Sequence, residues 1–124
     1  MTKRVLIIDD EPSTLKVLKR SLELNHYRVS LASNGRDGIE QALKNKPDAI
    51  LLDIIMPELD GWQVLEFLKA NEKTEDVPVI MLTGRGLLAD VEKSYSMGAR
   101  DYILKPFQLR KVREKIDKAL EECS

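Results

Sequence analysis

The chain has 124 residues, of which 43% are hydrophobic and 33% are charged, and its formal net charge is -1. This length fits one domain with a layered core, and the near-zero charge argues against the strongly basic surface of a nucleic-acid-binding domain. The single cysteine excludes an intrachain disulfide, and no apolar run reaches the roughly 20 residues that a membrane-spanning helix needs. The sequence therefore predicts one cytoplasmic domain over residues 1–124, without membrane contact.

Five short segments have the composition of β-strands, in chain order 5–8, 27–31, 48–53, 77–82 and 101–104. Most are continuous apolar runs, which is typical of strands buried on both faces of a sheet. The second one, Tyr27-Arg-Val-Ser-Leu31, alternates apolar and polar residues and so predicts a strand at a sheet edge.

Each strand is followed by a segment with the apolar periodicity of an amphipathic helix. These segments begin at Pro12, at Gly35, after Asp60 and at residue 87, and the last extends from Leu109 to Leu120. Proline suits the first turn of a helix, aspartate suits the N-cap, and Gly98 suits the end of the fourth helix. Leu109, Val112, Ile116 and Leu120 mark the last helix as amphipathic.

Regular alternation of strands and helices predicts an α/β fold with a parallel sheet and helices on both faces. Right-handed crossovers restrict the topology to a few arrangements. With the second strand at an edge, the favoured arrangement is a doubly wound five-stranded sheet of order 2-1-3-4-5, the flavodoxin-like three-layer sandwich.

Functional side chains follow four of the predicted strands. Asp9 and Asp10 come directly after the first, Asp53 ends the third, and Thr83 and Lys105 come directly after the fourth and fifth. In open α/β sheets the ligand site lies at the carboxyl ends of the strands. Any one of these residues also fits a solvated loop, but all of them together predict a site at this edge.

The residue types at this edge suit phosphoryl chemistry. Carboxylates packed so closely repel one another unless a cation lies among them, and an oxygen-only set favours Mg²⁺, with Mn²⁺ as the alternative. Lys105 and Thr83 offer donors for phosphoryl oxygens. Asp53 can itself act as a nucleophile and form an aspartyl phosphate.

The chain resembles the response-regulator receiver domains of two-component signalling, of the chemotaxis type, over essentially its whole length. The matching motifs are Asp9-Asp10, Asp53 with Met56-Pro57 and Asp60-Gly61, Thr83-Gly84, and Lys105-Pro106-Phe107. Each motif is common alone, whereas the ordered set is highly specific. The resemblance implies a phosphoprotein that catalyses only its own phosphorylation and dephosphorylation.

The resemblance also implies a role for each site residue. Asp53 would accept the phosphoryl group from a phosphohistidine on a histidine kinase or phosphotransfer protein. Asp9, Asp10, Asp53 and the backbone carbonyl of Ile55 would bind Mg²⁺, and Thr83 and Lys105 would hold the phosphoryl group.

Further residues are assigned by the resemblance alone. Tyr102 would follow Thr83 in a conformational switch that changes the surface of the fourth helix, fifth strand and fifth helix. Lys105-Pro106 would form a cis peptide bond. Ile55 and Arg85 would flank the phosphoryl group and tune its lifetime.

Several alternatives remain open in the sequence. A phosphatase with an aspartyl-phosphate intermediate would want an acid at position 55, and a flavin-binding module would want a Ser/Thr/Gly-rich loop where this chain has Asp9-Asp10-Glu11. The domain could act alone on a protein partner or belong to a longer regulator with an effector domain. We expect no direct nucleic-acid contact by this domain, which would act as a monomer or as a phosphorylation-dependent dimer.

Overall fold

The computed structural model describes residues 2–84 and 86–123, and its centre is a parallel sheet of five strands. The strands are β1 (Arg4–Ile8), β2 (Arg28–Ala32), β3 (Ala49–Leu52), β4 (Val79–Thr83) and β5 (Asp101–Leu104). Their order is β2-β1-β3-β4-β5, with every neighbouring pair parallel. The predicted fold class, strand order and edge position of the second strand are confirmed.

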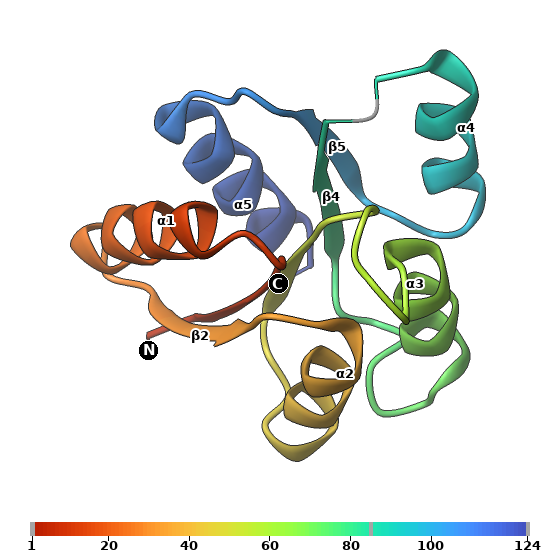
Figure 1. Cartoon of the computed structure of the whole chain (residues 1–124). Helices are drawn as coiled ribbons and strands as arrows, with labels where there is room; N and C mark the ends of the chain where they lie inside the picture. The colour runs from red at the N-terminus through yellow and green to blue at the C-terminus, as the bar shows by residue number, and fades with distance from the viewer. Residues whose placement is uncertain (1, 85, 124) are drawn as a thin grey trace.

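Helices cover both faces of the sheet (Figure 1). They are α1 (Pro12–Leu24), α2 (Gly35–Lys44), α3 (Gly61–Ala70), α4 (Leu88–Ser96) and α5 (Leu109–Cys123). Helices α1 and α5 pack on one face, and α2, α3 and α4 on the other. Within the described residues, no helix is both long enough and apolar enough to cross a bilayer.

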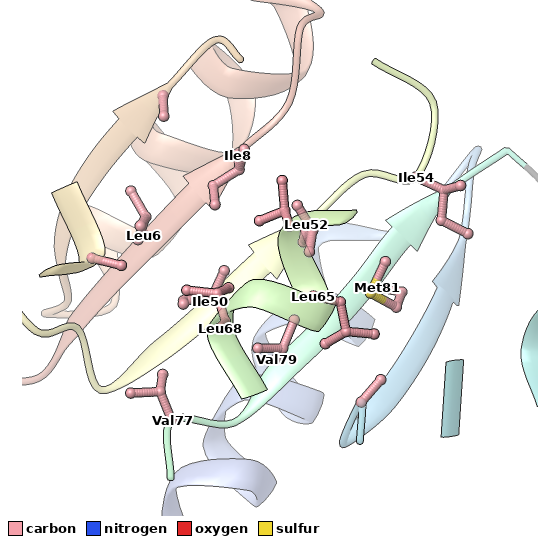
Figure 2. Close-up of a cluster of buried hydrophobic side chains, with 14 of the residues drawn as sticks. Leu6, Ile8, Ile50, Leu52, Ile54, Leu65, Leu68, Val77, Val79 and Met81 are labelled. Atoms are coloured by element: carbon pink, nitrogen blue, oxygen red, sulfur yellow. The ribbon is translucent and has the colours of Figure 1, made fainter. Parts of the chain in front are cut away.

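The alternation of side chains along the strands divides the core into two layers. Leu6 and Ile8 of β1 belong to the layer under α2 and α3, whereas Val5 and Ile7 belong to the layer under α1 and α5. Figure 2 shows the first of these layers. All of β3 is buried, which explains why its sequence is apolar at every position.

Several predicted strand bounds are wrong: Tyr27 precedes β2, and Asp48 and Asp53 lie on either side of β3. Val77 and Pro78 precede β4 instead of belonging to it, because Pro78 has no N–H to donate to a sheet and only its carbonyl accepts, from the Ile50 N–H. Leu109, the first residue of the predicted apolar stripe, is 39% exposed at the first turn of α5. The remaining apolar stripe of α5 packs against the sheet as predicted.

The start of α3 is fixed by its own sequence, as predicted for Asp60. The Asp60 carboxylate accepts a hydrogen bond from the Gln63 N–H, and the Gln63 side chain accepts one from the Asp60 N–H, both at 3.0 Å. This reciprocal capping box satisfies two backbone donors that the first turn of a helix leaves free.

Gly61 allows the start of α3 to pack closely against the segment that carries Asp53. Its N–H donates to the Ile54 carbonyl at 2.8 Å. A Cβ at this position would lie 2.1 Å from the carbonyl oxygen of Asp53 and 2.5 Å from the Cα of Ile54. Since the atoms in the way are backbone, no side-chain rotation could relieve the clash.

We therefore expect Gly61→Ala to lower the free energy of unfolding by about 2 kcal/mol or more, through overpacking against backbone. Gly84→Ala is the matched control, because a Cβ at Gly84 meets nothing within 4 Å. Urea unfolding of the two variants measures the difference, and equal stability of both would contradict the close-packing argument.

Candidate functional site

Three carboxylates meet at the carboxyl edge of the sheet. Asp9 directly follows β1 and Asp53 directly follows β3, and the register of these strands pairs Ile8 with Leu52. Asp9 and Asp53 are buried, whereas Asp10 is exposed. One carboxylate oxygen from each of the three acids lies within 4.8 Å of the others. The structure thus brings together the three acids that the sequence predicted at this edge.

The backbone fixes the two buried acids in place. The Asp9 N–H donates to Ala32 O at 3.1 Å, and the Asp53 N–H donates to Ile8 O at 3.0 Å. Each carboxylate also accepts a hydrogen bond from the backbone two residues on, Asp9 from Glu11 at 2.9 Å and Asp53 from Ile55 at 3.3 Å. These hydrogen bonds extend the sheet pairing past the strand ends and orient both carboxylates.

Lys105 brings a positive charge into this cluster from the end of β5. Its Nζ lies 2.8 Å from Asp9 Oδ2, 3.1 Å from Asp53 Oδ2 and 2.6 Å from Glu11 Oε1. Its own N–H donates to Thr83 O at 2.9 Å, and the Lys105–Pro106 peptide bond is cis, the conformation that the resemblance implies. The ammonium therefore has a carboxylate acceptor for each of its three protons.

The pKa values of two groups reflect this arrangement. Burial raises the pKa of Asp9, although hydrogen bonds from Lys105 and the Glu11 N–H oppose the increase. Burial alone would lower the pKa of Lys105, but hydrogen bonds to Asp9 and Glu11 outweigh it and raise that pKa. The stability from this lysine is therefore fully present below its ordinary pKa of 10.5 and is lost only as the pH rises through the folded-state value.

The donor set of the cluster fits a hard divalent cation. Asp9, Asp10 and Asp53 offer carboxylate oxygens only, the ligand type that Mg²⁺ prefers. Asp10 is exposed, so solvent and ions can reach the cluster. One ammonium shared among several acids leaves negative charge uncompensated, and a cation would neutralise it.

The other predicted residues lie around this cluster at different depths. Thr83 is fully buried at the end of β4, where it pairs in register with Leu104, and Tyr102 is 9% exposed within the core. Ile55, two residues after Asp53, is 57% exposed. Arg85 lies outside the described residues.

Glu11 is a site residue that the sequence reasoning did not assign. In the sequence it stands only as the last acid of the run after β1, next to Pro12. Its carboxylate nevertheless makes the shortest of the three contacts with Lys105. The three consecutive acids after β1 were the sequence signal that could have pointed to this residue. Hydrophobic periodicity, however, does not show which acids of a loop contact a lysine at the end of a distant strand.

The fold and the acidic cluster together are those of a signalling domain, and comparison with known proteins agrees. The family model described as "Response regulator receiver domain" matches residues 5–117. The chain therefore belongs to the response-regulator receiver family, and receiver domains are signalling domains of two-component systems that bind Mg²⁺ at their acidic pocket.

Individual relatives extend this finding. The chain is 37% identical over 113 residues to the DNA-binding dual master transcriptional regulator RpaA of Synechocystis, covering 91% of this chain and 47% of RpaA. The chain thus spans about half the length of the curated relatives it matches. Because that relative is named as DNA-binding, the similarity gives no support to the expectation of no nucleic-acid contact.

Solved structures match along nearly the whole chain. A CheY-like receiver domain from Methanospirillum hungatei has a TM-score of 0.91 and 33% identity, with 99% of this chain and 97% of that one covered. The receiver domain of a Pseudomonas aeruginosa sensor histidine kinase has a TM-score of 0.89 and 30% identity, with 98% and 99% covered, and holds a magnesium ion in its active site cleft.

We expect Lys105→Met to lower the free energy of unfolding by about 1–3 kcal/mol in metal-free buffer, because it leaves buried carboxylates without their cation. Added Mg²⁺ should restore part of the loss by binding the folded state. Lys118→Met, an exposed change on α5, is the control. Thermal unfolding with and without Mg²⁺ measures both, and identical behaviour of the two variants would contradict the expectation.

Proposed function

We propose that residues 1–124 form a single receiver domain in which Asp53 accepts a phosphoryl group from a phosphohistidine. The observation that carries this proposal is the position of Asp53. Its carboxylate is buried at the sheet edge, beside the acids of the β1 end and 3.1 Å from the ammonium of Lys105. A carboxylate so placed is oriented, shielded from bulk water and flanked by a positive charge.

In the proposed reaction a carboxylate oxygen of Asp53 attacks phosphorus. The phosphorus–nitrogen bond of the phosphohistidine breaks, the electron pair leaves with the imidazole, and an aspartyl phosphate remains. Lys105 would exchange its contact with Asp53 Oδ2 for one with a phosphoryl oxygen. The buried Thr83 hydroxyl would donate to another such oxygen.

The acids Asp9, Asp10 and Asp53, with the Ile55 carbonyl, would hold the cation in this proposal. Mg²⁺, or Mn²⁺ as the alternative, would supply positive charge to the phosphoryl oxygens when bound. The oxygen-only donor set described above supports this assignment. The proposed phosphodonor is a histidine kinase or a histidine phosphotransfer protein. The proposal also places this domain in the cytoplasm.

The signal would leave through the surface of α4, β5 and α5. Thr83 is buried and Tyr102 nearly so on adjacent strands, which supports their proposed coupling. This surface exposes apolar side chains, namely Leu88, Tyr95 and Leu104. It would control a protein partner, an effector domain on the same chain or phosphorylation-dependent dimerisation, and the half-length match to transcriptional regulators favours an effector domain.

A phosphatase that uses an aspartyl-phosphate intermediate is the weaker proposal. Such an enzyme needs an acid near its nucleophile to act on the leaving group. The residue two positions after Asp53 is Ile55, whose apolar side chain cannot transfer a proton. Glu11, the additional acid near Asp53, is paired with Lys105.

Incubation with Mg²⁺ and acetyl phosphate tests the main proposal. Intact-mass analysis should show one added phosphoryl group, absent from Asp53→Ala because the attacking carboxylate is gone. Asp76→Ala is the control, since Asp76 is exposed and pairs with Lys46 at the surface. Labelling that persists in Asp53→Ala would overturn the proposal.

The lifetime of the phosphoform tests the role of Ile55. An apolar, exposed side chain beside Asp53 cannot orient an attacking water, so we expect Ile55→Asn to speed loss of the phosphoryl group several-fold. The decay of phosphorylated protein after removal of acetyl phosphate measures this rate, with Val17→Asn, an exposed apolar residue on α1, as control. An unchanged rate in Ile55→Asn would contradict this role.

A further inference from the structure

Glu11 is placed beside Lys105 by the loop that also carries Asp9. Its N–H donates to Asp9 Oδ1 at 2.9 Å, which holds the loop backbone against the buried acid. Glu11 also occupies the N-cap position of α1, but its carboxylate makes no hydrogen bond to the first turn. The carboxylate is used instead by Lys105, whose Nζ lies 2.6 Å from Oε1.

The three partners of Lys105 differ in depth. The side chains of Asp9 and Asp53 are 2% and 6% exposed, whereas that of Glu11 is 54% exposed. The ammonium is closest to the exposed acid and farthest from Asp53, at 2.6 Å against 3.1 Å. Glu11 therefore draws the ammonium toward solvent and competes with Asp53 for it.

We propose that Glu11 is a positioning residue that holds Lys105 when Asp9 and Asp53 engage a cation. Without Glu11, the ammonium would have only the two buried acids as partners and would compete more strongly for their oxygens. With Glu11, the lysine keeps a carboxylate partner at the mouth of the site. This inference rests on the proposed function, because it assigns Glu11 to the cation step that precedes phosphoryl transfer.

Calorimetric titration with Mg²⁺ tests this role without measuring phosphorylation. Glu11→Gln keeps the shape of the side chain and removes its charge. We expect it to weaken Mg²⁺ binding by roughly two- to fivefold, the range that a partly exposed ion pair spans. Glu58→Gln is the matched control, since Glu58 is an exposed acid in the loop between β3 and α3, and we expect it to change the affinity by less than about 1.5-fold.

A double-mutant cycle separates positioning from the simple effect of one negative charge. If Glu11 acts by holding Lys105, Glu11→Gln should have little effect in a Lys105→Met background, because the competing ammonium is then absent. Loss of affinity only when Lys105 is present supports the inference. Equal weakening in both backgrounds, weakening as large in Glu58→Gln, or no weakening in Glu11→Gln overturns it.

The Mg²⁺ titration and the acetyl phosphate labelling test the two proposals separately, so the failure of one can be told from the failure of the other. A chain that binds Mg²⁺ with the expected coupling, yet is not labelled at Asp53 by acetyl phosphate, would contradict the phosphoacceptor proposal and support the role of Glu11. A chain labelled at Asp53 with no coupling between Glu11 and Lys105 would do the reverse.

Discussion

The site depends on the ion pairs that the ammonium of Lys105 makes with its neighbouring acids. Its Nζ lies within 3.1 Å of two buried carboxylates and of the exposed Glu11. Buried acids are costly unless they are paired, so the ion pairs with this lysine stabilise Asp9 and Asp53 in their positions. The same ammonium must release an oxygen before another group can bind there. The site is therefore held together by a contact that its proposed chemistry has to rearrange.

The sheet order makes this contact possible. Because β1 and β3 are neighbours, Asp9 and Asp53 lie side by side, and β4 and β5 bring Thr83 and Lys105 to the same edge. Gly61 then packs directly against the carbonyl of Asp53, so the start of α3 lies in close contact with the segment that carries this acid. The hydrophobic core on both faces of the sheet packs against the strands that carry the acids. The geometry of the acids therefore depends on the stability of the fold.

Much of the site was predictable from strand ends alone. Parallel strands carry their carboxyl ends to one edge, so apolar runs that end in Asp9, Asp53, Thr83 and Lys105 predict a cluster there. Local sequence also predicts the Asp60 cap of α3, because capping depends on residues three apart. The apolar stripe predicted for α5 packs on the sheet through Val112 and Ile116, whereas Leu109 at the first turn is partly exposed.

The sequence by itself determined the fold class, the strand order and the acids of the site, because these follow from hydrophobic periodicity and from residues next to strand ends. The tertiary structure alone decided that Glu11 is one of the acids in contact with Lys105. Glu11 and Lys105 are 94 positions apart and meet only because β1 and β5 end at one edge of the sheet. Their 2.6 Å contact depends on the reach and depth of two long side chains, which periodicity does not encode.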